Sequence, residues 1–228
     1  MRSALISAIL GLSLSATGAG AEQEKVVIEL FTSQGCSSCP PADAMLRELA
    51  GRDDVIALAL HVDYWDYIGW EDSFAEPAFT QRQKGYARAA GERIVYTPQM
   101  IVGGTDHVVG TRPMEIATLI DTHSEVETGV ELDLRVEGDT VHVRAEGDAG
   151  PLVVQVARFD PIETVEIHRG ENAGRTIDYA NIVTSWEAIG QWDGAEPFEA
   201  EVPRGESPMA VILQRPGHGA ILAAADVE

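Results

Sequence analysis

The segment from Phe31 to Asp43 reads FTSQGCSSCPPAD and contains the only two cysteines of the chain, Cys36 and Cys39. The residues just before it, VVIEL, are apolar or β-branched around one glutamate, which predicts a buried strand. Two prolines follow the second cysteine, and proline is favoured at the first positions of a helix. The cysteine pair is therefore expected between the end of a strand and the start of a helix.

Strands and helices alternate along the chain on both sides of this segment. A helix is predicted to open at Pro40, and the apolar stretch from Asp54 to His61 indicates a second buried strand. A helix from about Glu76 to Ala90 follows, then two strands joined by the turn Gly103-Gly104, and a helix from Pro113 to about Ser124. The order β-α-β-α-β-β-α predicts an α/β domain built on a four-stranded mixed sheet.

The pattern changes after Glu127, where apolar residues alternate with charged ones. The predicted short strands are Val130–Val136, Thr140–Ala145, Leu152–Phe159, Thr164–His168, Phe198–Val202, Met209–Gln214 and Ala220–Ala225. The Gly/Asn-rich segment 170–194 is expected to be a packed loop, with a binding surface as the alternative. We therefore predict an α/β domain over residues 22–127 and an all-β, sandwich-like domain over residues 128–228.

The first 21 residues have the three parts of a secretory signal. Arg2 supplies a positive end, residues 4–16 are apolar, and Ala19-Gly20-Ala21 forms a small-x-small cleavage site. The apolar run is shorter than the roughly 20 residues that a membrane-spanning helix requires. We expect a mature chain that begins at Glu22 and is periplasmic or secreted after cleavage near Ala21. A membrane-anchoring first helix is the less favoured alternative.

The composition argues against several classes of protein. The chain has 37 acidic and 16 basic residues and a formal net charge of −21, which disfavours binding to nucleic acid or to anionic lipid. No second apolar stretch is long enough for a stable membrane span. Two cysteines are too few for a protein held together by a disulfide framework. The pair therefore requires its own explanation.

A Cys-x-x-Cys pair at the start of a helix allows redox chemistry, metal binding or a structural staple. Unpaired amides and the helix dipole lower the pKa of the first cysteine. We therefore expect Cys36, nearer the solvent, to attack a substrate disulfide and Cys39 to resolve the mixed disulfide. Ser37 and Ser38 are expected hydrogen-bond donors to the thiolate, and Pro40 is expected to disfavour helical geometry at Cys39. A staple is disfavoured because so short a loop removes little chain entropy.

A second group of candidate residues begins at the end of the strand that closes with His61. Reacting groups collect at the carboxyl ends of parallel strands in open α/β sheets, so these residues are expected near the cysteines. His61 or Asp63 is a candidate proton donor or acceptor. Tyr64, Trp65 and Trp70 are candidates for an apolar wall that binds a peptide or a small thiol. The alternative is an ordered loop that only packs against the sheet, with Asp63 capping backbone amides.

The element order, with Cys-x-x-Cys after the first strand, resembles the thioredoxin fold in its minimal form. This resemblance implies a cis-proline that faces the disulfide, and Thr97-Pro98 stands at that position. The segments FTSQGCSSCPPAD, HVDYWDYIGW, YTPQMIVGG and GENAGRT are similar to an uncharacterised family of secreted bacterial and plant proteins within the thioredoxin superfamily, known only as a domain of unknown function. Gly35 departs from thioredoxin, which has tryptophan before the first cysteine.

The residues and the resemblance together predict a periplasmic or secreted thiol-disulfide oxidoreductase. The predicted catalytic residues are Cys36, Cys39 and Pro98, and the predicted substrate-binding residues are Thr97, His61, Asp63, Tyr64 and Trp65. The expected partners are protein or small-molecule thiols and disulfides, with a redox-active disulfide in place of a cofactor and with no metal. A copper- or zinc-handling protein, which the Cys-Pro ending resembles, and a non-catalytic binding module are the alternatives.

Overall fold

The computed structural model describes residues 25–228, so the predicted signal segment and its cleavage site lie outside the described residues. The elements in chain order are β1 (Val26–Thr32), α1 (Pro40–Leu49), β2 (Val55–His61), the 3₁₀ helix η1 (Asp66–Ile68), α2 (Pro77–Ala89), β3 (Gln99–Val102), β4 (Asp106–Val109), α3 (Pro113–Ser124), β5 (Val130–Glu137), β6 (Thr140–Gly147), β7 (Leu152–Ile167), β8 (Arg175–Trp192), β9 (Phe198–Pro203), β10 (Met209–Gln214) and β11 (Ile221–Val227). No helix among them is long and apolar enough to cross a bilayer.

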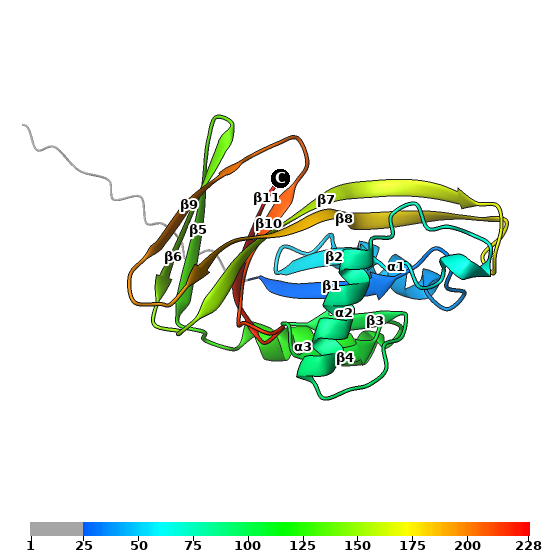
Figure 1. The fold of residues 1–228 in the computed structure, drawn as a ribbon, viewed down its shortest axis with the longest axis horizontal. Coiled ribbons are helices and arrows are strands. Elements are labelled where there is room, and N and C mark those ends of the chain that lie inside the picture. Colours follow the sequence, from blue (N-terminus) through cyan, green and yellow to red (C-terminus); the bar gives the residue numbers. More distant parts are fainter. Residues whose placement is uncertain (1–24) are drawn as a thin grey trace, which may run out of the picture.

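The strands form two sheets. The larger sheet has eight strands in the order β11-β10-β7-β8-β2-β1-β3-β4, and the smaller has three in the order β5-β6-β9. In the larger sheet β2 is parallel to both β1 and β8, whereas the other neighbouring strands are antiparallel. Figure 1 shows the three-stranded sheet at one end of the molecule and the helices around the other end.

The prediction of a four-stranded thioredoxin-like sheet with a separate all-β domain is wrong, because one eight-stranded sheet combines strands from both parts of the chain. The first four strands and three α-helices follow the predicted chain order, but β2 is not an edge strand. β8 pairs with β2 at Ala59 and Ile182, and the side-chain amide of Asn181 donates to the Ala57 carbonyl at 2.9 Å. β2 is buried along its whole length, so an open edge would leave its backbone groups without partners.

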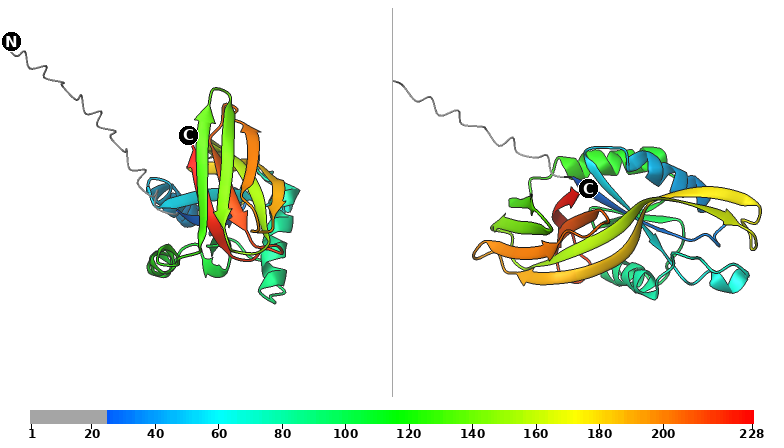
Figure 2. Two further views of the ribbon diagram at one scale, coloured as in Figure 1. Left: turned by 90° about the vertical axis from the view of Figure 1, so that its left-hand side faces the viewer. Right: turned by 90° about the horizontal axis from the view of Figure 1, so that it is seen from above.

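Both faces of the large sheet are covered, which explains why β1 and β2 are buried at every position. α1 and α3 cover one face, where Leu46 and Ile116 pack with Ile28 of β1. α2 covers the other face, where Phe79 packs with Leu58 of β2. Figure 2 shows α2 on the opposite side of the sheet from α1 and α3. The disulfide segment at the start of α1 is thus built on a rigid, two-sided core.

The three-stranded sheet packs against the end strands of the large sheet. Val143 of β6 and Val202 of β9 share a core with Val154 of β7 and Val211 of β10. The next residue of β10, Ile212, points to the opposite face and belongs to the core under α2. Successive residues of β10 therefore pack in two different cores, one between the two sheets and one under α2.

β7 and β8 form a hairpin much longer than the sequence predicts. β7 continues past Pro161, where two separate strands were predicted, and β8 occupies most of the segment 170–194, which was predicted to be a loop. Register shifts at Val154/Gln155 and Arg158/Phe159 interrupt the alternation of apolar residues, so the period of two is hidden in the sequence. Figure 1 shows this hairpin running from the three-stranded sheet to the loops that follow β1 and β2.

A buried charged network connects α2 to the large sheet. Arg82 of α2 donates to both carboxylate oxygens of Glu29 in β1, at 2.6 and 2.9 Å, and its guanidinium lies 3.7 Å from the ring centroid of Trp186 in β8. It also donates to the side-chain carbonyl groups of Gln155 in β7 and Gln214 in β10. The two-pronged guanidinium matches the carboxylate, and the extra bonds satisfy its remaining donors. One residue thereby links strands from both parts of the chain.

Candidate functional site

Cys36 and Cys39 form a disulfide between the end of β1 and the start of α1, with their Cα atoms 5.4 Å apart. Two successive backbone turns shape the segment. The Cys36 amide donates to the Ser33 carbonyl at 3.1 Å, and the Cys39 amide donates to the Cys36 carbonyl at 3.2 Å. The predicted position of the pair, after a buried strand and before a helix, is confirmed.

The backbone conformation just before α1 differs from the prediction. α1 begins at Pro40 as predicted, but Cys39 adopts a helical conformation as the N-cap residue, so the expectation that Pro40 disfavours this conformation is wrong. Pro40 and Pro41 have no N–H, and the amides of Ala42 and Asp43 donate to the Cys39 carbonyl at 2.8 and 3.1 Å. The first turn therefore offers no unpaired amide to a thiolate. Stabilisation of a thiolate at this end depends on the helix dipole and on side-chain donors.

Both cysteines are buried in the disulfide form, Cys36 with 1% and Cys39 with 0% of their surface exposed. The expectation that Cys36 faces the solvent is therefore wrong for this state. The two residues between the cysteines, Ser37 and Ser38, are exposed, and the Ser38 hydroxyl lies 3.4 Å from the Cys36 sulfur. Ser38 occupies the place expected for a donor to the Cys36 thiolate.

His61 ends β2 in register with Thr32 of β1 and is fully buried. Its Nδ1 lies 2.8 Å from Oδ2 of Asp72, which also accepts the amide of Gln34 at 2.7 Å. Burial raises the pKa of Asp72, but the nearby His61, its hydrogen bond and the amides of Gln34 and Phe74 outweigh burial and lower the pKa below its ordinary value. The ionised Asp72 accepts a hydrogen bond from Nδ1–H of His61, which directs Nε2 of the ring away from it.

Asp43 lies one helical turn after Cys39 and is buried. The Thr32 hydroxyl donates to its Oδ1 at 2.6 Å. Burial raises the pKa of Asp43 to about 7, an effect that the Thr32 bond and the charge of His61 partly oppose. A carboxyl group with this pKa exchanges protons near neutral pH, and side chains one turn apart lie on the same face of a helix.

Four buried side-chain nitrogen or oxygen atoms of the described residues have no hydrogen-bond partner, and all four belong to residues around the disulfide segment. They are Oδ2 of Asp43, Nε2 of His61, Oδ1 of Asn172 and the hydroxyl of Tyr179. The rings of His61 and Tyr179 are 5.0 Å apart between centroids. The pKa of Tyr179 is raised by burial and by the charges of Asp43 and Asp72. Unpaired buried polar groups are rare in folded proteins, and their gathering here marks a candidate functional site.

Two of the predicted residues turn toward α2. The Thr80 hydroxyl donates to Oδ1 of Asp63 at 2.6 Å, so the carboxylate connects this loop to α2. The hydroxyl of Tyr64 donates to Oε1 of Gln83 at 3.2 Å, and burial raises the pKa of Tyr64 to about 12. Both residues therefore have bonding partners on α2, whereas the packed-loop alternative expected Asp63 to cap backbone amides.

Trp65 joins the cysteine segment to the proline loop. Its indole N–H donates to the Thr97 hydroxyl at 2.8 Å. Gly35 packs against it so closely that an added Cβ would lie 3.2 Å from the Cβ of Trp65. The peptide bond between Thr97 and Pro98 is cis, as predicted, and Pro98 and Ala42 of α1 both lie beside Gly110. The structure brings these predicted residues to the end of the molecule that holds the disulfide.

The sequence did not identify Asp43, Asp72, Asn172 and Tyr179 as residues of this cluster. Asp43 could have been noticed in the sequence, because it is an acidic residue on the same buried face of the helix as Leu46 and Leu49. The other three come from segments that only the tertiary fold brings to the disulfide. Asn172 lies in GENAGRT, one of the segments that carry the family resemblance, but that resemblance gave it no role.

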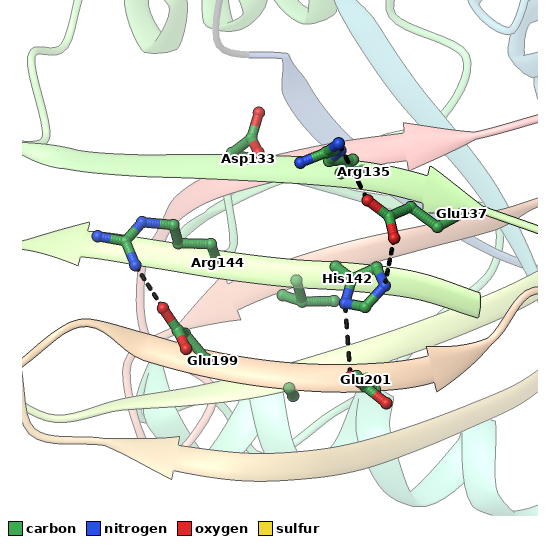
Figure 3. Close-up of a pocket in the computed structure, with 9 residues that line it drawn as sticks. Asp133, Arg135, Glu137, His142, Arg144, Glu199 and Glu201 are labelled. Atoms are coloured by element: carbon green, nitrogen blue, oxygen red, sulfur yellow. Dashed lines mark hydrogen bonds and ion pairs between the residues drawn. The ribbon is translucent and has the colours of Figure 1, made fainter.

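A charged groove lies on the outer face of the three-stranded sheet and has a volume of about 530 Å³. Figure 3 shows Arg144 paired with Glu199, and His142 between Glu137 and Glu201. These side chains are solvent-exposed, except the half-buried His142, and pair across neighbouring strands, which is typical of a solvated sheet surface. The candidate site is therefore the disulfide end of the molecule.

Residues 27–214 match the family described as "Protein of unknown function (DUF1223)". The chain belongs to this family. The DUF1223 match includes both the cysteine segment and the β7–β8 hairpin that reaches it. No curated protein matches the chain.

Two solved structures resemble this DUF1223 chain. A protein from Agrobacterium tumefaciens, whose crystal structure comes from a structural genomics consortium, is 37% identical, with a TM-score of 0.79 over 91% of this chain and 96% of that one. HBP35 of Porphyromonas gingivalis is 16% identical, with a TM-score of 0.59 over 91% of this chain and 76% of that one. The second likeness concerns the fold alone. These comparisons establish the DUF1223 family and do not support the expected place in the thioredoxin superfamily.

Proposed function

We propose that the chain is a thiol-disulfide oxidoreductase in which Cys36 and Cys39 alternate between a disulfide and two thiols. The observation that carries the proposal is the position of the disulfide within a buried cluster of ionisable groups that includes Asp43 and His61. A bond across so short a loop contributes little as a staple. Thiol exchange, in contrast, needs the thiols to lose and gain protons, which nearby groups that take up and release protons accelerate.

The exchange step follows from the chemistry of thiols. The Cys36 thiolate attacks one sulfur of a partner disulfide, and the partner's other sulfur leaves as a thiolate. Cys39 then loses a proton, attacks the Cys36 sulfur and releases the partner as a second thiolate. The partner gains two electrons, and the protein regains its disulfide. The direction of net exchange depends on the partner's reduction potential.

Asp43 is the proposed acceptor of the Cys39 proton. It follows Cys39 by one helical turn, and its raised pKa of about 7 allows both protonation states near neutral pH. His61, predicted as a proton carrier, lies close enough to Asp43 for its charge to lower the Asp43 pKa. His61 therefore acts on the exchange through the carboxyl group in this proposal.

A partner would reach the disulfide past the exposed Ser37 and Ser38. Trp65 and the exposed Tyr67 stack nearly parallel beside this segment, with ring centroids 6.4 Å apart, and they offer an apolar contact surface. We assign peptides or small thiols as ligands of this surface, because aromatic rings bind apolar groups of many different peptide sequences. Because Cys36 is buried, binding must also displace part of its surroundings.

Export to an oxidising compartment is part of the same proposal. Its support is the signal-like composition of residues 1–21, since disulfides persist outside the cytosol. Within residues 25–228, no group of three or more histidine, cysteine, aspartate or glutamate side chains is arranged to hold a metal, so the metal-handling alternative rests on the cysteine pair itself.

Trapping of partners tests the proposed function. Cys39→Ala removes the resolving thiol, so mixed disulfides should accumulate on Cys36 in acid-quenched cells and disappear on reduction. The Cys36→Ala variant is the matched control and should trap little. Metal content is measured on the same preparations. If wild type binds metal, both variants lose it and no adduct forms, the proposal is replaced by a metal-handling function. If neither an adduct nor bound metal is found, the remaining alternative is a non-catalytic binding module.

A further inference from the structure

The tip of the β7–β8 hairpin reaches the disulfide segment from a part of the chain more than 130 residues away in sequence. Asn172 at this tip is 1% exposed. Its side-chain amide donates one hydrogen bond to the Gln34 carbonyl and another to the Cys36 carbonyl, each at 2.9 Å. Both hydrogens of the amide are therefore directed at the backbone of the cysteine segment.

The Cys36 carbonyl is held from two sides. It accepts the Cys39 amide at 3.2 Å and the Asn172 amide at 2.9 Å, which uses both of its lone pairs. The Cys39 bond is local to the segment, whereas the Asn172 bond comes from the hairpin. The position of this carbonyl therefore depends on the hairpin tip.

The tip itself is an ordered structure. The Gly174 amide donates to the Ile167 carbonyl at 2.7 Å, which closes the turn. Gly170 packs on Trp70, where an added Cβ would lie 3.2 Å from the Trp70 Cβ. Trp70 in turn donates its indole N–H to the side-chain carbonyl of Gln34 at 2.8 Å. The tip, Trp70 and the cysteine segment form one packed unit.

We propose that Asn172 is a positioning residue that stabilises the disulfide form of the Cys36–Cys39 pair and so lowers its reduction potential. The inference rests on the proposed function, because it names what tunes the same redox pair. Reduction by a dithiol transfers two electrons to the disulfide and breaks the S–S bond. The two cysteine sulfurs take up two protons, and the dithiol becomes a disulfide.

The reason lies in the movement that reduction requires. Two thiol sulfurs cannot remain at covalent bonding distance, and both cysteines are enclosed by packed residues. The segment between Gln34 and Cys39 must therefore shift when the bond breaks. A shift of the Cys36 carbonyl weakens the Asn172 bonds, so these bonds favour the oxidised state.

The reduction equilibrium of purified protein tests this inference. Wild type, Asn172→Ala and the control Glu171→Ala are equilibrated in dithiothreitol redox buffers, and the reduced fraction is measured by thiol alkylation and mass. Glu171 is the exposed neighbour of Asn172 in the same tip. Asn172→Ala should raise the equilibrium constant for reduction about tenfold, which is about 30 mV for a two-electron couple, while Glu171→Ala should not change it.

A purely structural role for Asn172 predicts a different result, because it would destabilise both redox forms equally and leave the potential unchanged. An unchanged potential in Asn172→Ala overturns the inference. If this variant does not fold, the side-chain amide signals of Asn172 in wild type are followed by NMR. Slow hydrogen exchange in the oxidised form and fast exchange in the reduced form are expected, and equal exchange overturns the inference. Neither readout needs a partner, so failed trapping would affect only the proposed function.

Discussion

Asp43 is the residue whose protonation most affects the candidate site. Its folded pKa of about 7 lies above the ordinary value of 3.8, so between these pH values the folded protein holds a proton that the unfolded chain has released. The stability associated with this proton is complete below pH 4 and is lost as the pH rises through 7. The ionised, buried carboxylate therefore destabilises the oxidised protein in alkaline solution.

Asp43→Asn removes this titration with little change of shape, and the amide oxygen can still accept the Thr32 hydroxyl. The free energy of unfolding at pH 8 should rise above that of wild type, by up to about 4 kcal/mol, while the two proteins should be nearly similar at pH 4. Urea unfolding of the oxidised proteins measures both values. The exposed Asp53→Asn is the control. An equal effect of Asp43→Asn at both pH values would show that Asp43 does not titrate in this range.

Residue identity and spacing were enough to find part of the site. Cys36 and Cys39 stand out because they are the only cysteines, and Trp65 because it follows a buried strand. Asn172 could not be found in this way. Its role depends on a hairpin that carries it to the Cys36 carbonyl, and an Asn in a Gly-rich turn is otherwise typical of any turn.

At the scale of elements, the turn between β3 and β4 supports a contact between distant parts of the chain. The Ile221 amide donates a hydrogen bond to the Gly103 carbonyl at 2.9 Å. Gly104 has a φ of +78°, and an added Cβ would lie 2.6 Å from the Gly219 carbonyl oxygen. A backbone atom cannot move aside as a side chain can. The position therefore excludes any residue with a Cβ for two separate reasons.

Gly217 supplies a matched control, because its φ is also +78° but an added Cβ would meet no atom within 4 Å. Gly217→Ala should lower the free energy of unfolding by about 1–2 kcal/mol, the usual cost of a left-handed conformation. Gly104→Ala should lower it by a further 1–3 kcal/mol or so, because of the backbone clash. Urea unfolding compares the two variants. Equal losses would mean that the β3–β4 turn does not pack on Gly219 as described.

Elements with local start and stop signals were predicted well. The helix predicted from about Glu76 to Ala90 is α2, which begins at Pro77, and Gly91 with a φ of +72° follows its C-cap residue. β8 was missed because its strand character depends on pairing with β7 and β2 and not on a local pattern. Strand propensity depends on neighbours in this way more than helix propensity does.

At the scale of the whole molecule, the error in the predicted fold has a single cause. The order of elements along the chain was predicted, but strand order in a sheet depends on which edge a distant strand joins. β8 joins β2 and carries β7, β10 and β11 into the same sheet. That arrangement also places the hairpin tip on the cysteine segment. The candidate site is therefore a product of the combined sheet.

The central claim, that Cys36 is a reactive thiol resolved by Cys39, is tested most directly by the rates at which purified single-cysteine variants react with glutathione disulfide. We expect reduced Cys39→Ala to form a stable adduct at Cys36, faster than an ordinary exposed thiol and faster than Cys36→Ala forms one at Cys39. Reduced wild type should instead return to its internal disulfide and release glutathione. If Cys39→Ala reacts no faster than an ordinary thiol, or if the two variants react equally, the oxidoreductase assignment is contradicted.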